Sequence, residues 1–340
     1  MKILVDAFGG DNAPEEIVKG AVSALSKNKN FTLGLTGKKA EIEKLLSAEN
    51  FDARRVEIID APEIITCEEE PVMAVRRKVN SSMGAAFTLL KDGGADGFVS
   101  AGSTGALLAG STLKVGRIAG VNRPALCPVL PTVQAGKKVL LLDAGANADC
   151  KPVNLVQFAV MGSVYAKVAL GVKNPRVALL SNGTEDKKGN KINQEAFPYL
   201  KEIKCASFAG NAEAREIMSG EYDVVVADGF SGNVALKSME GSMKGLFTLL
   251  KAELMSSARG KLGALLLKKS FYKLKSELDY NNYGGAVFLG VKKVIVKAHG
   301  SAKRVSIENA VLQAVSAAEA SLSETIAAEL SAIDLEGLEG

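Results

Sequence analysis

The chain has 340 residues, of which 47% are hydrophobic and 24% are charged, a composition typical of a folded globular protein. Its 42 basic and 38 acidic residues leave a net charge of +4, which is too small to indicate a general nucleic-acid-binding surface. The length suits either one large α/β unit or about two domains of ordinary size.

The four cysteines include no closely spaced pair, which excludes a zinc ribbon and a thioredoxin-type motif and favours a reduced, cytoplasmic setting. The N-terminus passes from residues 3–5 directly into acid and glycine, so we expect no secretion signal. No stretch reaches about 18 uninterrupted apolar residues, so we also expect no membrane-spanning helix. Contact with a membrane surface remains open.

Short apolar runs alternate along the chain with longer segments of helical periodicity. The first run, residues 3–7, is followed by Gly9 and Gly10 and by a helix that opens at Pro14. Six further runs predict strands at residues 32–35, 56–60, 97–100, 139–143, 177–181 and 222–228. Several are apolar throughout, as parallel strands covered by helices on both faces should be. The pattern predicts a three-layer α/β fold with a doubly wound, mostly parallel sheet.

No repeat or Pro-rich linker divides the chain, so we expect residues 1–340 to form a single α/β unit with one projecting excursion at 240–282. Within it, Lys244–Lys275 carries eight basic residues and one acid, Glu253. Leucines at 262 and 265–267 lie beside lysines and predict an amphipathic helical element. It suits a lipid interface, an acidic partner or a dimer contact. Residues 305–333 predict one or two covering helices.

Five polar, glycine-containing loops each follow a predicted strand. Ligands of open parallel sheets bind beyond the carboxyl ends of the strands, where backbone N–H groups point outward. We therefore expect the loops to share one crevice. They span residues 6–11, 100–105, 143–147, 181–185 and 228–233.

Two of these loops are the strongest candidates for anion binding. Residues 103–105 offer hydroxyls and N–H groups at the start of a helix, although Ser103 or Thr104 could simply cap that helix. The loop after residue 228 adds an acid and Lys237, which combines anion binding with proton handling. Its alternative is a tight turn in which Asp228 caps the helix and Lys237 points to solvent.

The remaining loops are more ambiguous. Residues 182–184 supply donors but also fit plain turn chemistry, and Asp143 could bond to the backbone N–H groups of its own loop. Asp6 and Asp11 flank two glycines, yet no further acid or histidine lies near them in the sequence, so we expect no metal site.

The single histidine, His299, ends an apolar strand and could act as an acid, a base or a donor to phosphate. A Ser-His-Asp triad would have to include it, and zinc chemistry finds no paired ligands. The chain contains no Gly-x-Gly and no P-loop motif, which excludes the standard dinucleotide and triphosphate sites. The loops offer many backbone hydrogen-bond donors but no good nucleophile. Such a site suits a reaction in which a substrate, for example inorganic phosphate, is itself the nucleophile.

Eight segments, taken in order, resemble the PlsX family, bacterial acyl-acyl-carrier-protein:phosphate acyltransferases of phospholipid synthesis. The chain differs mildly in having Phe8 where the family more often has Met and Ser103 where Asn is usual. The segments that carry the resemblance are 6–14, 100–107, 123–126, 143–150, 182–189, 228–241, 283–286 and 299–301.

The resemblance implies transfer of a long-chain acyl group from acyl carrier protein to phosphate, giving acyl phosphate and free carrier protein. This is the first step towards phosphatidic acid and needs no cofactor. The family also implies a fold similar to phosphotransacetylases and isocitrate-dehydrogenase-like proteins, a homodimer, and peripheral contact with the anionic inner face of the membrane. A downstream membrane acyltransferase would use the acyl phosphate, and no nucleic acid is involved.

The loops and the resemblance together give a hypothesis for the site. Asp228 orients Lys237, which faces phosphate or oxyanion charge, and His299 is a possible phosphate donor. Phosphate is assigned to Ser103, Thr104, Gly105, Asn182, Gly183 and Thr184. The thioester oxygen is assigned to Ser231, Gly232 and Asn233. The remaining expected substrate-binding residues are Asp6, Gly9, Gly10 and Asn147.

Three alternatives stay open at this stage. A phosphotransacetylase would move small acyl groups between phosphate and coenzyme A, and would accept acetyl-coenzyme A while rejecting acyl carrier protein. A membrane-surface scaffold without activity would bind phosphate but not turn over. A decarboxylating dehydrogenase of similar fold is the most distant, since no metal or nucleotide set is visible.

Overall fold

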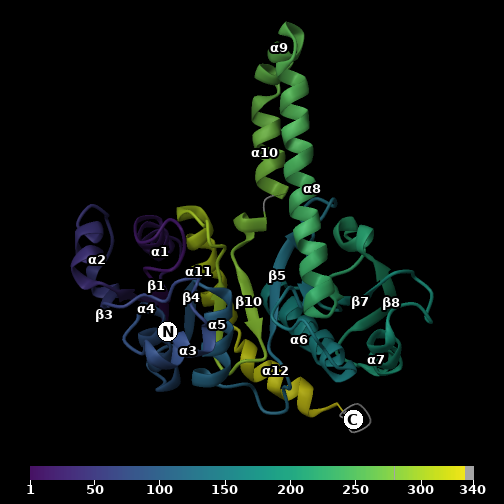
Figure 1. The fold of residues 1–340 in the computed structure, drawn as a ribbon, viewed down its shortest axis with the longest axis horizontal. Coiled ribbons are helices and arrows are strands. Elements are labelled where there is room, and N and C mark those ends of the chain that lie inside the picture. Colours follow the sequence, from purple (N-terminus) through teal and green to yellow (C-terminus); the bar gives the residue numbers. More distant parts are fainter. Residues whose placement is uncertain (279, 334–340) are drawn as a thin grey trace.

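The computed structural model describes residues 1–278 and 280–333, in which the strands form one sheet with the order β3-β2-β1-β4-β11-β10-β5-β6-β9-β7-β8. In Figure 1 the elements of the first half of this order lie on one side of the body, and β7 and β8 lie on the other. The strands are β1 (Lys2–Asp6), β2 (Thr32–Gly37), β3 (Val56–Asp60), β4 (Gly97–Ser100), β5 (Ala125–Pro131), β6 (Lys138–Leu142), β7 (Arg176–Ser181), β8 (Ser207–Glu213), β9 (Val224–Val226), β10 (Ala286–Leu289) and β11 (Val294–Lys297).

The sheet consists of two parallel halves that run in opposite directions. Strands β3, β2, β1, β4 and β11 are parallel to one another, and so are β6, β9, β7 and β8. Between them, β10 pairs antiparallel with β11 and with β5, and β5 pairs antiparallel with β6. The predicted α/β class and mostly parallel sheet are confirmed.

Helices cover both faces of the sheet. Along β1, Ile3 and Val5 pack into the cluster beneath α1 and α11, whereas Leu4 packs into the cluster beneath α4 and α5. This alternation is why the strands are apolar throughout. The helices are α1 (Glu15–Lys27), α2 (Lys39–Leu46), α3 (Pro71–Arg77), α4 (Ser82–Lys91), α5 (Thr104–Gly110), α6 (Pro152–Leu170), α7 (Lys191–Glu202), α8 (Gly229–Met255), α9 (Ala258–Leu266), α10 (Lys268–Leu278), α11 (Arg304–Glu319) and α12 (Leu322–Ser331).

Helix α6 is the central helix of the second half. Its residues from Val153 to Ala166 are all buried, and Gly162 lies so close to β9 that a Cβ there would be 2.7 Å from Val224. Among the described helices it alone is long and apolar enough to cross a membrane, but 78% of its apolar window is buried inside the protein. It is therefore explained as a core helix.

The strands predicted from apolar runs are present, with ends shifted by one or two residues in most cases. The run at 222–228 is shorter than expected, since β9 covers only three residues. Strands β5, β8 and β10 were not predicted. The C-terminal segment forms two helices, α11 and α12, as one of the expected alternatives had it.

The basic segment forms a helical hairpin that projects from the body, with α8 rising and α9 and α10 returning (Figure 1). Helix α8 has 27 residues and is about 40 Å long at 1.5 Å per residue. No described residue of α9 or α10 is buried, and the side chains of Leu265 and Leu266 are 67% and 76% exposed. Of the predicted excursion at 240–282, residue 279 lies outside the described part of the chain.

Candidate active site

The carboxyl ends of the two oppositely directed halves meet at the middle of β5. Strand β11 ends at Lys297, which pairs with Ala286 of β10, and Ala286 pairs with Pro128 of β5. Just after the end of β6, the amide of Ala144 donates to the carbonyl of Leu126 over 2.9 Å. Leu126 lies in β5, two residues before Pro128. Loops that follow both halves are thus brought to one place, although the halves point in opposite directions.

Asp143 organises the loop after β6. Its buried carboxylate accepts hydrogen bonds from the amides of Leu126 at 2.9 Å, Ala146 at 3.0 Å and Asn147 at 2.7 Å. Burial raises the pKa of the Asp143 carboxyl, while these hydrogen bonds lower it. The Asn147 amide nitrogen donates to Asp143 and to the carbonyl of Pro124, so this predicted substrate-binding residue is engaged within the loop.

Helix α8 begins directly against this loop. Asp228 caps the helix, accepting from the amide of Ser231 and from its hydroxyl, both at 2.8 Å. A Cβ at Gly229 would be 2.5 Å from the carbonyl oxygen of Asn147, and one at Gly232 would overlap the carbonyl of Asp143. The two glycines therefore serve this close packing, and the capping alternative for Asp228 is what the structure contains.

A cavity of about 310 Å³ opens where these elements meet. It lies between β5, the ends of β6 and β11, the start of β10 and one face of α8. Gly145 and Asn233 approach closely at its edge, because a Cβ on the glycine would be 3.3 Å from the Asn233 amide carbon. The polar or charged side chains that line the cavity are Thr104, Asn233, Lys237, Glu240, Lys297 and His299.

Lys297 is a candidate functional residue that the sequence did not reveal. Its largely buried ammonium group donates to the carbonyl of Ala101 over 3.3 Å and to that of Ala298. Burial lowers the pKa of Lys297 to about 8, an effect that the nearby groups of Cys67, Asp11 and Asp6 oppose. A buried cation that faces a cavity is a strong partner for an anion.

His299 stands at the mouth of the same cavity. Its Nδ1 accepts from the amide of Ser301 at 3.2 Å and lies 2.8 Å from the Ser301 hydroxyl. The neutral ring therefore carries its proton on Nε2, as assigned from this hydrogen-bond pattern. Burial, followed by the positive charges of Lys297 and Lys237, lowers the pKa of the imidazole. The ring is thus a neutral N–H donor near pH 7.

Lys237 forms an ion pair on the face of α8 that lines the cavity. Its Nζ lies 2.8 Å from Oε2 of Glu240, three residues later. The lysine side chain is 56% exposed and the glutamate only 21%. Lys237 therefore reaches the cavity from its open side, while Lys297 reaches it from the core.

The first two loops support the cavity from behind. Asp6 accepts from the Ser100 hydroxyl at 2.7 Å, and burial raises the pKa of its carboxyl. A Cβ at Gly9 would be 2.7 Å from the amide of Gly102, and Gly10, at φ +97°, would bring one within 2.8 Å of the carbonyl of Gly300. The first loop thus packs on the loops after β4 and β11 and does not line the cavity.

The three residues at the start of α5 have separate roles. Ser103 caps the helix, since its hydroxyl oxygen accepts from the amide of Ala106 at 3.3 Å. Gly105 makes room for α3, because a Cβ there would be 2.7 Å from Pro71. Of the predicted anion cradle at 103–105, only Thr104 lines the cavity.

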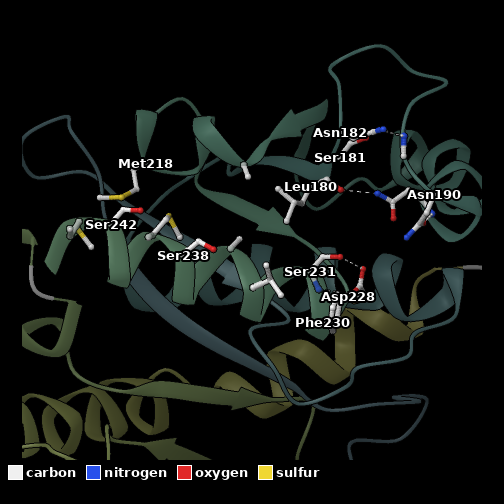
Figure 2. A pocket seen from close by; sticks show the side chains of 17 residues that line it. Leu180, Ser181, Asn182, Asn190, Met218, Asp228, Phe230, Ser231, Ser238 and Ser242 are labelled. Carbon is white, nitrogen blue, oxygen red and sulfur yellow. Dashed lines mark hydrogen bonds between the residues drawn. The ribbon is translucent and has the colours of Figure 1, made fainter. Parts of the chain in front are cut away.

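A second, larger cavity of about 860 Å³ lies on the other side of α8 (Figure 2). Figure 2 shows Ser231, Ser238 and Ser242 along the helix and Asn182 and Asn190 on the facing loops. Ser231 and Glu240 are nine residues apart, which at about 100° per residue places them on opposite faces of α8. The polar residues of the two cavities are thus separated by the helix itself.

The predicted phosphate cradle made of residues 103–105 and 182–184 is therefore not formed. Strands β4 and β7 are six positions apart in the sheet, about 29 Å at 4.8 Å per strand. Asn182 instead accepts from the amide of Gly189 at 2.9 Å and lines the larger cavity. Gly183 is buried beside the side chains of Glu185 and Lys188, and Thr184 is exposed and lines neither cavity.

Metal ligands are not clustered in the described residues, where no group of three or more His, Cys, Asp or Glu side chains could hold an ion. The cysteines do not form a reactive pair either, and burial raises the pKa of the Cys150 thiol to about 11. The smaller cavity therefore offers cations, an imidazole N–H, a hydroxyl and an amide. These groups suit the binding of an oxyanion and the stabilisation of developing negative charge.

The fold is shared with phosphotransacetylases of known structure. The EutD phosphotransacetylase from Staphylococcus aureus matches 94% of this chain and 94% of its own, with a TM-score of 0.60 and 19% identity. A phosphotransacetylase from Streptococcus pyogenes matches with the same coverage, a TM-score of 0.63 and 17% identity. At this identity the likeness defines the α/β fold, as expected from the sequence.

Sequence similarity defines the family. The family described as "Fatty acid synthesis protein" matches residues 1–325. A phosphate acyltransferase from Clostridium tetani is 46% identical over 330 residues, covering 97% of this chain and 98% of the relative. A phosphate acyltransferase from Bacillus cereus (strain B4264) is 49% identical over 313 residues, covering 92% and 93%. The chain belongs to this family, the PlsX family that its loops resemble.

Proposed function

We propose that this protein is a phosphate acyltransferase, which converts a long-chain acyl-acyl-carrier-protein and inorganic phosphate into acyl phosphate and free carrier protein. The observation that supports this most directly is the convergence of Lys237, Lys297 and His299 on one cavity whose lining, in the described part of the chain, includes no serine or cysteine. Relatives named phosphate acyltransferase, at 46% and 49% identity over most of the chain, support the same activity.

The chemistry needs no nucleophile from the protein. An oxygen of hydrogen phosphate forms a bond to the thioester carbonyl carbon, and the carbon–sulfur bond breaks with its electron pair on sulfur. The proton that hydrogen phosphate loses balances the one that the leaving thiolate gains. In this proposal Lys297 and Lys237 hold the phosphate, and His299 and the amide of Asn233 lie on the side of the developing charge.

The rest of the predicted site takes supporting roles in this proposal. Asp143 and Asn147 shape the loop under α8, Asp228 fixes the start of that helix, and the first loop holds the strand ends together. Of the six residues that the sequence analysis assigned to phosphate at 103–105 and 182–184, Thr104 is the one that keeps a direct contact in this proposal. Ser231 faces the larger cavity, and Gly232 provides space rather than a contact.

The second candidate is a phosphotransacetylase that uses acetyl-coenzyme A. The observation in its favour is the fold that the chain shares with two phosphotransacetylases. Substrate competition separates the two. With palmitoyl-acyl-carrier-protein and acetyl-coenzyme A each supplied with phosphate, we expect kcat/KM to favour the carrier-protein thioester by at least about 100-fold. Turnover of acetyl-coenzyme A with rejection of the carrier protein would establish the alternative.

The hairpin of α8, α9 and α10 is proposed as the contact surface for acidic partners. The eight basic residues of its segment 244–275 suit acyl carrier protein and the anionic inner face of the membrane, and its exposed leucines suit insertion into the lipid interface. The enzyme is proposed to be a cytoplasmic homodimer in peripheral contact with that face. Its product is chemically suited to a downstream membrane acyltransferase, since acyl phosphate is an activated acyl donor.

A further inference from the structure

One acidic side chain lies in a cavity that otherwise presents cations and neutral donors. Among the described residues that line the smaller cavity, Glu240 is the only acid, and the charged groups around it are Lys237 and Lys297. A site that bound phosphate by charge alone would be weakened by a carboxylate. Its presence therefore requires a separate explanation.

The two oxygens of Glu240 differ. Oε2 lies 2.8 Å from the ammonium of Lys237, whereas Oε1 is buried and no hydrogen-bond donor among the described residues reaches it. An unpaired buried carboxylate oxygen is costly, because it has lost water without gaining a partner. Glu240 thus lines the cavity and carries one buried acceptor oxygen that the protein itself does not satisfy.

A donor carried by an anion would suit both Oε1 and the surrounding groups, which are cations and N–H or O–H donors. Hydrogen phosphate has that combination, because it presents negative oxygens together with a P–OH group at neutral pH. Sulfate has the same shape and size but is fully ionised, so each of its oxygens would repel the carboxylate. The geometry thus favours one oxyanion over a close isostere.

We propose that Glu240 accepts the hydrogen bond of the P–OH group of inorganic phosphate and thereby makes the site select phosphate against sulfate. This inference rests on the proposed function, which places phosphate in the smaller cavity. In this arrangement Lys237 holds the carboxylate in position through Oε2, and Lys297 binds the ionised phosphate oxygens from the core side. A site that hydrogen-bonds a ligand hydroxyl strongly rejects analogues that lack it.

The first test is binding to the unmodified full-length protein. Isothermal titration calorimetry with inorganic phosphate and with sulfate, at pH 7.5 and constant ionic strength, should give a Kd for sulfate at least about 100-fold higher. Sulfate binding within about threefold of phosphate would overturn the proposal. This measurement needs no variant and no turnover.

The second test is Glu240→Gln. The amide can present its NH₂ to the anion, so we expect the preference for phosphate to fall by at least about tenfold, with sulfate binding improved. Glu253→Gln, an exposed position on the same helix, is the matched control and should leave both affinities unchanged. A folded Glu240→Gln protein that keeps the wild-type preference would overturn the proposal.

Turnover assays separate this inference from the function on which it rests. If carrier-protein release depends on phosphate but sulfate inhibits as strongly as phosphate binds, the activity stands and the role of Glu240 is wrong. If no turnover occurs but phosphate is bound selectively and Glu240→Gln removes the selectivity, the role of Glu240 stands and the proposed activity fails.

Discussion

Lys297 shows how burial gives a common residue a particular role. It lies at the end of β11, which pairs with β4 on one side and β10 on the other, so its ammonium group is held inside the fold. Its hydrogen bonds to described residues reach backbone carbonyls alone, which leaves its charge available to a ligand. In the sequence it is one lysine among many, and only the pairing of distant strands distinguishes it.

Replacing this cation tests its assignment. We expect Lys297→Met to lower kcat/KM for phosphate by about 100-fold, because a charge-assisted contact to the anion is lost. Lys292→Met, at an exposed residue near the opposite end of β11, is the matched control and should change little. Steady-state kinetics with phosphate as the varied substrate, together with circular dichroism to show folding, decide the matter. An unchanged KM and kcat would remove Lys297 from the site.

The pH dependence follows from the same residue. Lys297 is charged below its pKa of about 8 and neutral above it, so kcat/KM for phosphate should fall about tenfold per pH unit above that value. The pKa of His299 is lowered by burial and by Lys297, so its neutral, donating form persists below pH 6.5. A profile measured from pH 5.5 to 10 tests both limbs, and kcat/KM that stays flat through pH 9 contradicts the assignment.

At the scale of elements, the contact between α8 and the loop after β6 holds the site together. Helix α8 starts on that loop, lines the cavity and continues into the hairpin, while the hairpin returns to residues 284–286, which also line the cavity. Both ends of the projecting hairpin are therefore attached to the candidate active site. Displacement of the start of α8 should disturb binding on either side of the helix.

Two glycines on this helix give a matched pair of variants. Gly232→Ala would force a Cβ onto the carbonyl of Asp143, so we expect a loss of about 1–3 kcal/mol in the free energy of unfolding and a large loss of activity. Gly245→Ala meets no atom within 4 Å and should stabilise the helix by up to about 1 kcal/mol. Denaturant unfolding measures both. Equal stability of the two variants would show that the packing at residue 232 is not tight.

The hairpin tip has a separate test. We expect Leu265→Ser with Leu266→Ser to reduce flotation of the protein on vesicles containing anionic lipid by at least about tenfold, because two exposed apolar side chains no longer enter the interface. Activity on a soluble carrier-protein thioester should persist. Unchanged flotation would exclude insertion, and a change in molecular mass by light scattering would instead assign these leucines to a dimer contact.

The elements that the sequence revealed are those with local signals. Parallel strands such as β4 and β6 are short apolar runs, and Asp228 and Lys237 follow such a run in an obvious polar loop. Strand β5 was missed because it contains Pro128 and Pro131, and proline is uncommon inside a sheet. Strand β8 was missed because it is largely polar. Which loops share a cavity depends on strand order, and that order arises from pairings between residues far apart in the chain.

At the scale of the whole molecule, two parallel halves of opposite direction are joined through β5 and β10. Because the halves run in opposite directions, their carboxyl ends would lie at opposite edges of the sheet if all the strands were level with one another. The offset pairing along β5 brings Lys297 and the loop after β6 to the same level, and α8 closes the space between them. The sequence therefore predicts most of the polar loops but not the division of their residues between two cavities.

The central claim is that phosphate is the acyl acceptor. The most direct measurement is release of free carrier protein from palmitoyl-acyl-carrier-protein by the purified full-length protein, with and without inorganic phosphate, together with detection of acyl phosphate. We predict release only when phosphate is present, with one acyl phosphate formed for each carrier protein freed. Release at the same rate without phosphate, or no reaction in either direction by folded protein, would contradict it.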